Sequence, residues 1–417
     1  MEQTPKSLRV QIGIFGRTNV GKSSLLNMIC GQDIAVTSAV AGTTTDVVEK
    51  AVELLPIGPV VFLDTAGMDD TSVLAAERLK KTTMIFSRAD VVVCVVEPGM
   101  WTAYEDAIAA EAQKQKAPLI MVINKADTGM PSEEFISLCK KHTEHVMSCT
   151  SIGPRREAAV DAFKLLLLAA VPEDRLLPAP LIGDLLPPGG IVVMIVPIDL
   201  QAPRGRLILP QVQTIRDTLD ADATAIVVKE REYAHLLSRL NVAPDLVICD
   251  SQVVMKMVAD TPASVPCTTF SIVFSRFKGD LVEQAAGLAV IDSLKDGDKV
   301  LIAEACSHHA LADDIGRVKI PRWLRQYTGV DLIVDVYSGR DYPPNLKEYS
   351  LVIHCGSCML TRKETLARIA LAKEAGVPIT NYGLSISLIQ GVLKRALSPF
   401  PAALDAYVHE QSKRTII

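Results

Sequence analysis

Two groups of residues in this chain have types and spacings that could do chemistry. One is the segment 16–23, Gly-Arg-Thr-Asn-Val-Gly-Lys-Ser, and the other combines Cys306 with a Cys-x-x-Cys pair at Cys355 and Cys358. A glycine-rich loop that ends in Lys-Ser cradles phosphate groups, because its backbone amides can wrap around them. Cysteine thiolates that converge in space hold a metal ion or a metal cluster. The sequence therefore predicts one nucleotide site and one metal site.

The phosphate loop stands in the sequence context that its chemistry requires. It follows an apolar run at 10–15, expected as a strand, and precedes a helical pattern at 24–28. In such a loop Lys22 reaches the β and γ phosphate oxygens and the Ser23 hydroxyl binds Mg²⁺. The positions expected to contact the nucleotide here are Gly16, Arg17, Thr18, Asn19, Val20, Gly21, Lys22, Ser23 and Ser24.

Two further motifs indicate the magnesium shell and the base. Asp64 begins the motif Asp-Thr-Ala-Gly, so its carboxylate can hold the Mg²⁺ shell while the Gly67 amide senses the γ-phosphate. Asp127 ends the motif Asn-Lys-Ala-Asp, and its carboxylate can accept hydrogen bonds from N1 and N2 of guanine. Adenine lacks that pair of donors, so the predicted base is guanine. The expected base-binding positions are Asn124, Lys125, Asp127, Ser148 and Cys149.

The metal-binding pattern is compatible with two kinds of site. Three of the nine cysteines lie beside three of the seven histidines. Zinc would favour a closed tetrahedral site with a histidine as the fourth ligand. An iron–sulfur cluster held by three cysteines and a softer fourth ligand would keep one iron exchangeable, which suits cluster assembly or delivery and modestly favours this alternative. The candidates for the fourth ligand are His308, His309, His354, Asp313 and Asp314.

The pattern of apolar runs predicts an α/β protein with three domains. Residues 1–172 alternate apolar runs with helix-length amphipathic segments, which predicts a mostly parallel sheet. A proline-rich linker at 173–190 follows. Residues 191–262 read as a small α/β domain without a catalytic cluster, assigned to dimerisation, although a spacer fits equally well. Residues 266–417 form a third α/β domain, and its cysteines follow expected strands, where ligands of parallel sheets bind.

Composition excludes several classes of protein. The formal net charge of −5 provides no basic field for nucleic acid. The apolar runs are shorter than the roughly 18 residues that a membrane span needs, and the N-terminal residues lack an apolar signal region. We therefore expect a cytoplasmic protein that binds neither membrane nor nucleic acid. The tail at 402–417 is expected to be a loose helix or a disordered end.

Residues 8–172 resemble the Era and TrmE branch of the translation-factor-like GTPases, through the three nucleotide motifs and a threonine-rich switch segment at 43–46. The resemblance implies that Thr44 contacts magnesium and that Asn19 binds K⁺, which would stimulate hydrolysis of GTP to GDP and phosphate. Met68 stands where many such enzymes carry a water-orienting Gln, so intrinsic hydrolysis is expected to be slow. The expected catalytic residues are Lys22, Asp64, Asn19 and Thr44.

Over essentially its whole length the chain resembles the FeFe-hydrogenase maturation GTPases, the HydF family. The most specific stretch is Cys-Ser-His-His at 306–309 with Asp-Asp-Ile-Gly-Arg-Val-Lys-Ile-Pro-Arg at 313–322, followed later by His-Cys-x-x-Cys at 354–358. The resemblance implies a 4Fe–4S cluster with one labile iron site. Its ligands would be Cys306, Cys355 and Cys358, with Asp313 as first choice for the fourth and His308 and His354 as alternatives or as groups that orient the site.

The same resemblance implies a scaffold that works as a homodimer. It would receive a diiron precursor made by two radical-SAM maturases and pass it to the apo FeFe-hydrogenase. Order and disorder of the switch segments would let GTP drive the exchange of partners. The alternative is a zinc-stabilised or RNA-related regulatory GTPase of the Era type, and the identity of the bound metal would separate the scaffold from the zinc-stabilised switch.

Overall fold

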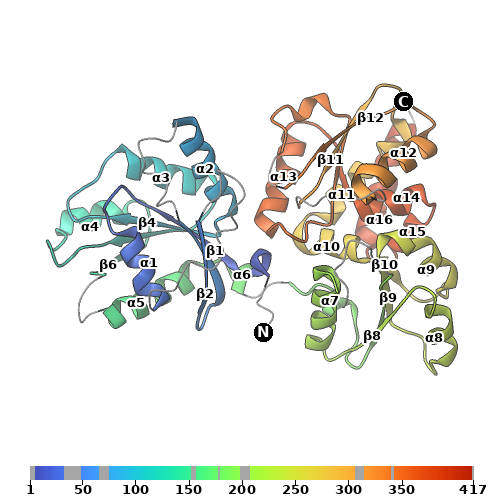
Figure 1. The fold of residues 1–417 in the computed structure, drawn as a ribbon, viewed down its shortest axis with the longest axis horizontal. Helices are drawn as coiled ribbons and strands as arrows, with labels where there is room; N and C mark the ends of the chain where they lie inside the picture. The colour runs from blue at the N-terminus through green and yellow to red at the C-terminus, as the bar shows by residue number, and fades with distance from the viewer. Residues whose placement is uncertain are drawn as a thin grey trace. The chain divides into compact units, whose positions relative to one another are not determined.

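The computed structural model describes residues 5–31, 48–64, 75–151, 156–176, 179–197, 207–305, 314–339 and 342–415. Within it the chain forms two compact units, Met1–Pro178 and Ala179–Ile417 (Figure 1). Several positions that the sequence singles out lie outside the described residues. They are Thr44, Gly67, Met68, Cys306, His308, His309 and Asp313.

The first unit is built on one six-stranded sheet with the order β2-β3-β1-β4-β5-β6. Only β2 runs antiparallel to its neighbour, so the expected mostly parallel sheet is confirmed. The strands are β1 (Val10–Phe15), β2 (Val48–Leu54), β3 (Gly58–Asp64), β4 (Val91–Val96), β5 (Leu119–Ile123) and β6 (His145–Ser148). The helices are η1 (Lys6–Leu8), α1 (Lys22–Cys30), α2 (Ala75–Arg88), α3 (Ala103–Lys114), α4 (Glu133–Lys140), α5 (Arg156–Ala170) and α6 (Glu173–Leu176).

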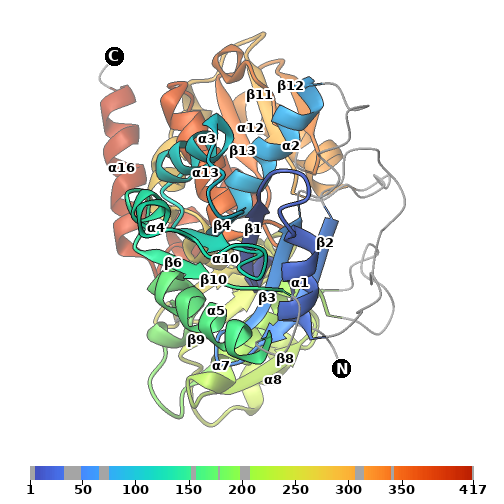
Figure 2. The same ribbon diagram turned by 90° about the vertical axis from the view of Figure 1, so that its left-hand side faces the viewer.

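Helices cover both faces of this sheet, which is why β1 and β4 are buried at every position. Leu25 of α1 and Phe163 of α5 pack in a cluster on one face. Phe86 of α2, Ile108 of α3 and Phe135 of α4 pack in a second cluster on the other face. Figure 2 shows helices α1 and α5 on one side of the sheet and α2 and α3 on the other. The two clusters fix the sheet between two helical layers, and the carboxyl ends of its central strands carry the nucleotide motifs.

The second unit contains two parallel four-stranded sheets, ordered β10-β9-β7-β8 and β12-β11-β13-β14. The strands are β7 (Ile191–Ile195), β8 (Thr224–Val228), β9 (Leu246–Cys249), β10 (Cys267–Thr269), β11 (Lys299–Ala303), β12 (Ile333–Tyr337), β13 (Leu351–His354) and β14 (Ile379–Asn381). The first group of helices is η3 (Gly183–Leu185), α7 (Leu209–Asp220), α8 (Tyr233–Arg239), η4 (Ser251–Val253), α9 (Val254–Asp260), α10 (Phe270–Lys278) and α11 (Leu281–Leu288). The second is η5 (Ile291–Ser293), the π-helical turn η6 (Ile315–Lys319), α12 (Ile320–Thr328), η7 (Leu346–Glu348), α13 (Arg362–Glu374), α14 (Tyr382–Ile389), α15 (Leu393–Ala396) and α16 (Pro401–Thr415).

One continuous hydrophobic cluster joins the two sheets of the second unit. It includes Val193 of β7, Phe274 of α10 and Ile302 of β11. The boundary expected at 262–266 comes before β10, which pairs with β9 of the first of these sheets. The change from one sheet to the next therefore occurs after α10, within a shared core.

The C-terminal tail, for which the sequence predicts a loose helix or a disordered end, is a helix that is packed rather than loose. Residues 401–415 form the helix α16, which packs along α11. Ala403 and Tyr407 are four residues apart and so lie on one face of the helix, where both are buried. No helix among the described residues has the length and apolar character needed to cross a membrane.

Candidate functional site

The phosphate loop joins β1 to α1 and needs glycine at both of its ends. Gly16 has φ 151° and Gly21 has φ 91°, conformations that other residues rarely adopt. A Cβ on Gly16 would stand 2.5 Å from the carbonyl oxygen of Val95, and one on Gly21 would stand 2.2 Å from Asn124 Nδ2. The loop leads into the N-terminus of α1, where unpaired backbone amides and the helix dipole favour an anion.

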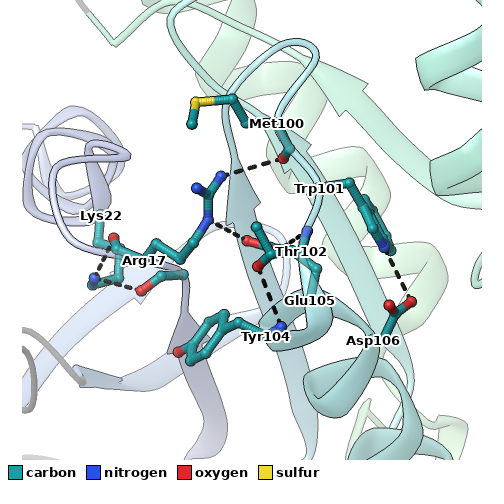
Figure 3. Close-up of polar contacts among 9 residues, drawn as sticks. Arg17, Lys22, Met100, Trp101, Thr102, Tyr104, Glu105 and Asp106 are labelled. Carbon is teal, nitrogen blue, oxygen red and sulfur yellow. Dashed lines mark hydrogen bonds and ion pairs between the residues drawn. The ribbon is translucent and has the colours of Figure 1, made fainter.

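Lys22 already points back into this loop (Figure 3). Its ammonium is buried and donates hydrogen bonds to the carbonyl oxygens of Gly16 at 2.6 Å and Arg17 at 2.9 Å. Phosphate oxygens in the loop would compete for the same ammonium. Ser23 and Ser24, in the first turn of α1, are exposed, as are Thr18 and Asn19 in the loop.

Arg17 is held away from the loop by Glu105, a contact that the sequence analysis missed (Figure 3). Arg17 Nε donates to Glu105 Oε1 at 2.7 Å, and Arg17 Nη2 donates to the Met100 carbonyl at 3.2 Å. The other carboxylate oxygen of Glu105 accepts from the backbone and hydroxyl of Thr102, which closes a capping box at the start of α3. Glu105 is 0% exposed. Thr-x-x-Glu at 102–105 is the sequence signal that could have found it.

Asn124 ties the base motif to the phosphate loop. Its buried Nδ2 donates to the Val20 carbonyl at 3.0 Å, and its Oδ1 accepts from the Ser151 hydroxyl at 2.8 Å. The Cys149 thiol lies 3.7 Å from the same Oδ1, and burial raises the pKa of that thiol to about 11, so it stays a neutral donor. The structure thus brings two of the predicted motifs together around one buried amide.

The remaining nucleotide positions lie at the carboxyl edge of the same sheet. Asp64 ends β3 beside Ile14 of β1 and is buried. Lys125 has φ 59° and pairs with Glu97, while Asp127 and Ser148 are exposed. Parallel strands place these ends along one edge, which is where nucleotides bind in such sheets.

The predicted metal site lies where β11 and β13 end side by side. Ala303 of β11 is in register with His354 of β13, and the Cys355 amide donates to the Ala303 carbonyl at 3.0 Å. The Ala305 amide donates to Cys355 Sγ at 3.0 Å. Cys306 directly follows Ala305 in the chain, although it lies outside the described residues. An amide that donates to sulfur suits a thiolate ligand, because it stabilises negative charge on the sulfur.

His354 orients the cysteine turn and has both ring nitrogens bonded. Arg368 Nη1 lies 3.0 Å from His354 Nε2, and a guanidinium can only donate, so Nε2 accepts. The proton therefore sits on Nδ1, 2.9 Å from the Cys355 carbonyl. Burial, together with the positive charge of Arg368, lowers the pKa of His354 to about 3. Of the two roles expected for His354, this geometry favours orientation over ligation.

Lys278 is another residue of the site that the sequence analysis did not find. It is 1% exposed and donates to the carbonyl oxygens of Ser357 at 3.2 Å, Cys358 at 3.1 Å and Leu360 at 2.8 Å. Burial raises the pKa of the Cys358 thiol, and the Lys278 ammonium opposes that rise. A weak sequence signal exists, because Lys278 follows Phe274 by four residues on the apolar face of α10, where lysine is rare without a partner.

The donor set fits either metal considered from the sequence. No group of three or more His, Cys, Asp or Glu residues that could hold a metal ion occurs in the part of the chain that the structure describes. Of the three expected cysteines, Cys355 and Cys358 are described there, and the Ala305 amide is directed at the sulfur of Cys355. The third, Cys306, directly follows Ala305 in the chain. Soft sulfur ligands suit zinc or an iron–sulfur cluster rather than magnesium or calcium.

The fold and the first site define a P-loop GTPase domain followed by two further α/β domains. Residues 11–125 match the family model of the 50S ribosome-binding GTPase. Residues 181–279 match the Hydrogen maturase F dimerization domain, and residues 282–399 match its tetramerization domain. These last two matches together span more than half of the chain. The chain belongs to the hydrogen maturase F (HydF) family, and its two matched domains indicate that it forms oligomers.

Curated relatives share only part of their length with this chain. GTPase Der from Persephonella marina is 37% identical over 144 residues, which are 33% of this chain and 32% of the relative. The tRNA modification GTPase MnmE from a Synechococcus species is 43% identical over 127 residues, 29% of this chain and 26% of the relative. A solved structure of Aquifex aeolicus Era bound to GDP and AlF₄⁻ has 18% identity and a TM-score of 0.31, covering 55% of this chain and 98% of that one. That TM-score is too low to support an argument.

Proposed function

We propose that this chain is a GTP-hydrolysing iron–sulfur scaffold that receives the diiron precursor of the FeFe-hydrogenase active site and delivers it to the apo-hydrogenase. The observation that carries the proposal is the pairing, in one HydF-family chain, of a guanine-nucleotide loop with a cysteine turn supported by an amide-to-sulfur hydrogen bond. A simple GTPase switch has no need of such a turn.

The proposed nucleotide chemistry assigns one task to each residue. Lys22 binds the β and γ phosphates, Ser23 and Thr44 bind Mg²⁺, and Asp64 holds the magnesium shell. Asn19 binds K⁺, which supplies the positive charge that an arginine finger supplies in other GTPases. With Met68 in place of a water-orienting glutamine, the intrinsic rate is slow.

Potassium dependence is tested by comparing GTP turnover in KCl and NaCl for the wild type and for Asn19→Ala. We expect KCl to accelerate the wild type and to have no effect on the variant. Asn19 is exposed but has φ 64°, which asparagine adopts more readily than alanine, so GTP binding by the variant is measured as the control for an intact loop. Equal wild-type rates in the two salts would refute the role of K⁺ without touching the scaffold proposal.

In the proposed metal site, Cys306, Cys355 and Cys358 hold a 4Fe–4S cluster. Such a cluster supplies one iron with an exchangeable position, to which a diiron precursor can attach. Asp313 or His308 is the proposed fourth ligand, because His354 uses both nitrogens to fix the turn. The proposed partners are a second copy of the chain, two radical-SAM maturases and the apo-hydrogenase.

The decisive experiment is low-temperature EPR of the anaerobically reconstituted, dithionite-reduced protein beside Cys306→Ala and Cys355→Ala. We expect a 4Fe–4S signal that weakens or disappears in both variants. Cys30→Ala is the matched control, since Cys30 is only half-buried and lies on α1 of the first unit. A silent spectrum with tightly bound zinc would instead support the zinc-stabilised regulatory GTPase.

A further inference from the structure

The cysteine turn contains a strained residue and a concentration of buried carbonyl groups. Ser357, between the two cysteines, has φ 56°, a left-handed conformation that costs a non-glycine residue free energy. The carbonyls of Ser357, Cys358 and Leu360 all lie within hydrogen-bonding distance of one buried atom, Lys278 Nζ. Buried carbonyls without donors are costly, so this turn needs a cation or several donors at that point.

Lys278 meets this need by donating to all three carbonyls. An ammonium has three N–H groups, and each of the three carbonyls lies within hydrogen-bonding distance of it. The side chain is buried along its length, and the ammonium is 5.7 Å from the centroid of the Phe274 ring. The side chain is therefore held at both ends, and its charge stays fixed beside the turn.

The position of this charge has an electrostatic consequence for anything bound to Cys355 and Cys358. One-electron reduction adds a negative charge to an iron–sulfur cluster. A fixed positive charge nearby stabilises the reduced form more than the oxidised form, and low local polarity strengthens the effect. Lys278 should thus make the cluster easier to reduce.

We propose that Lys278 is a positioning residue that holds the Cys355–Cys358 turn in its strained conformation and raises the reduction potential of the cluster bound there. The electrostatic half of this inference rests on the proposed function. Since α10 lies within the matched dimerization domain and the turn within the tetramerization domain, the same side chain ties the two domains together at the metal site.

The test uses the full-length protein and two substitutions. Lys278→Met keeps the length of the side chain and removes its charge and donors, whereas Lys278→Arg keeps the charge. Lys299→Met is the matched control, because Lys299 lies at the opposite end of β11 and pairs with Glu348 at the surface. The midpoint potential of the reconstituted cluster is measured by EPR-monitored redox titration.

We expect Lys278→Met to lower the midpoint potential, so that the ratio of reduced to oxidised cluster at a fixed potential falls at least tenfold, a shift of about 59 mV. Lys278→Arg and Lys299→Met should stay near the wild-type potential. Should Lys278→Met yield little folded protein, Lys278→Gln removes the charge and keeps a donor. An unchanged potential in the uncharged variant would overturn the electrostatic role.

The positioning role is measured separately on metal-free protein by hydrogen–deuterium exchange of residues 355–361. The Leu360 amide donates to the Ser357 carbonyl, so a loosened turn should exchange faster in Lys278→Met than in the wild type. Unchanged exchange would overturn this role. If the wild type itself takes up no cluster, the proposed function fails, and the exchange result still decides whether Lys278 holds the turn.

Discussion

The carboxylate of Glu105 joins the phosphate loop to the start of α3 from a fully buried position. We predict that Glu105→Gln lowers the free energy of unfolding by about 2 kcal/mol, because a buried charged hydrogen bond to Arg17 becomes a neutral one and the neutral amide cannot accept all the present bonds. Freed Arg17 should also loosen the loop and weaken GTP binding several-fold. Urea unfolding and titration with a fluorescent GTP analogue measure both effects.

Asp106→Asn provides the comparison for that substitution. Asp106 is the next residue along α3, and its exposed carboxylate accepts a hydrogen bond from Trp101 Nε1 (Figure 3). Exposed polar contacts of this kind contribute little to stability. Equal losses in the two variants would mean that Glu105 acts only through general charge and not through Arg17.

Gly21, like Gly16, is a residue of the loop where backbone conformation and lack of space together exclude a side chain. We predict that Gly21→Ala weakens GTP binding at least tenfold, about 1.4 kcal/mol, because the new Cβ would displace Asn124 from the loop. Gly31→Ala, at the other end of α1, has φ 69° but open space around it and should leave affinity unchanged. Isothermal titration with GTP compares the two, and unaltered binding by Gly21→Ala would contradict the assigned packing.

At the residue scale, the sequence predicts the motifs better than it predicts the residues that contact and orient them. The residues of segment 16–23 have a fixed spacing, because few arrangements of glycine and lysine let the backbone amides wrap around a phosphate. Lys278 and Arg368 could not be assigned to the cysteine turn from the sequence, because only folding brings them there. Lys278 comes 80 residues before Cys358, and Arg368 comes 14 residues after His354. Their contacts depend on tertiary packing, which local patterns do not encode.

Among the elements, the buried parallel strands are the ones that the sequence predicts well. β4 and β5 are continuous apolar runs because both of their faces are covered. No continuous apolar run marks residues 48–54, where charged residues interrupt the apolar ones, and β2 forms there because β3 offers it an edge. The apolar stretch at 382–396 forms two helices, α14 and α15, with Gly391 at φ 72° between them.

Helix α16 gives a test of what the tail contributes. We predict that Tyr407→Ala lowers the free energy of unfolding by about 3 kcal/mol, because Tyr407 is buried against α11 and its removal leaves a cavity. Val408→Ala, one residue later on the exposed face, should cost less than about 1 kcal/mol. Urea unfolding followed by circular dichroism compares them. Similar stabilities for the two variants would show that α16 does not stabilise the second unit.

For the whole molecule, the sequence predicts the number of domains, but it does not predict that two of them share one hydrophobic core. The three family matches agree with a three-domain chain, with the change from the second to the third domain between residues 279 and 282. The last two domains nevertheless share one hydrophobic core and form one compact unit. A proline cluster at 262–266 resembles a linker locally, yet β10 directly after it completes the preceding sheet. The pairing of β10 with β9 is what shows that the domain continues beyond these prolines.

The division into two compact units argues that the two sites form independently. Lys22→Ala should reduce GTP turnover about a hundredfold or more, because the phosphates lose the charge that stabilises them during transfer. Iron uptake should stay unchanged, since the cysteine turn belongs to the other unit, which has its own core. Cys355→Ser should lower iron uptake and leave GTP turnover unchanged. Phosphate release measures GTP turnover, and mass spectrometry measures the iron content of each variant. Loss of iron from folded Lys22→Ala would mean that the nucleotide loop is needed to build the metal site, and that the two chemistries are coupled already at assembly.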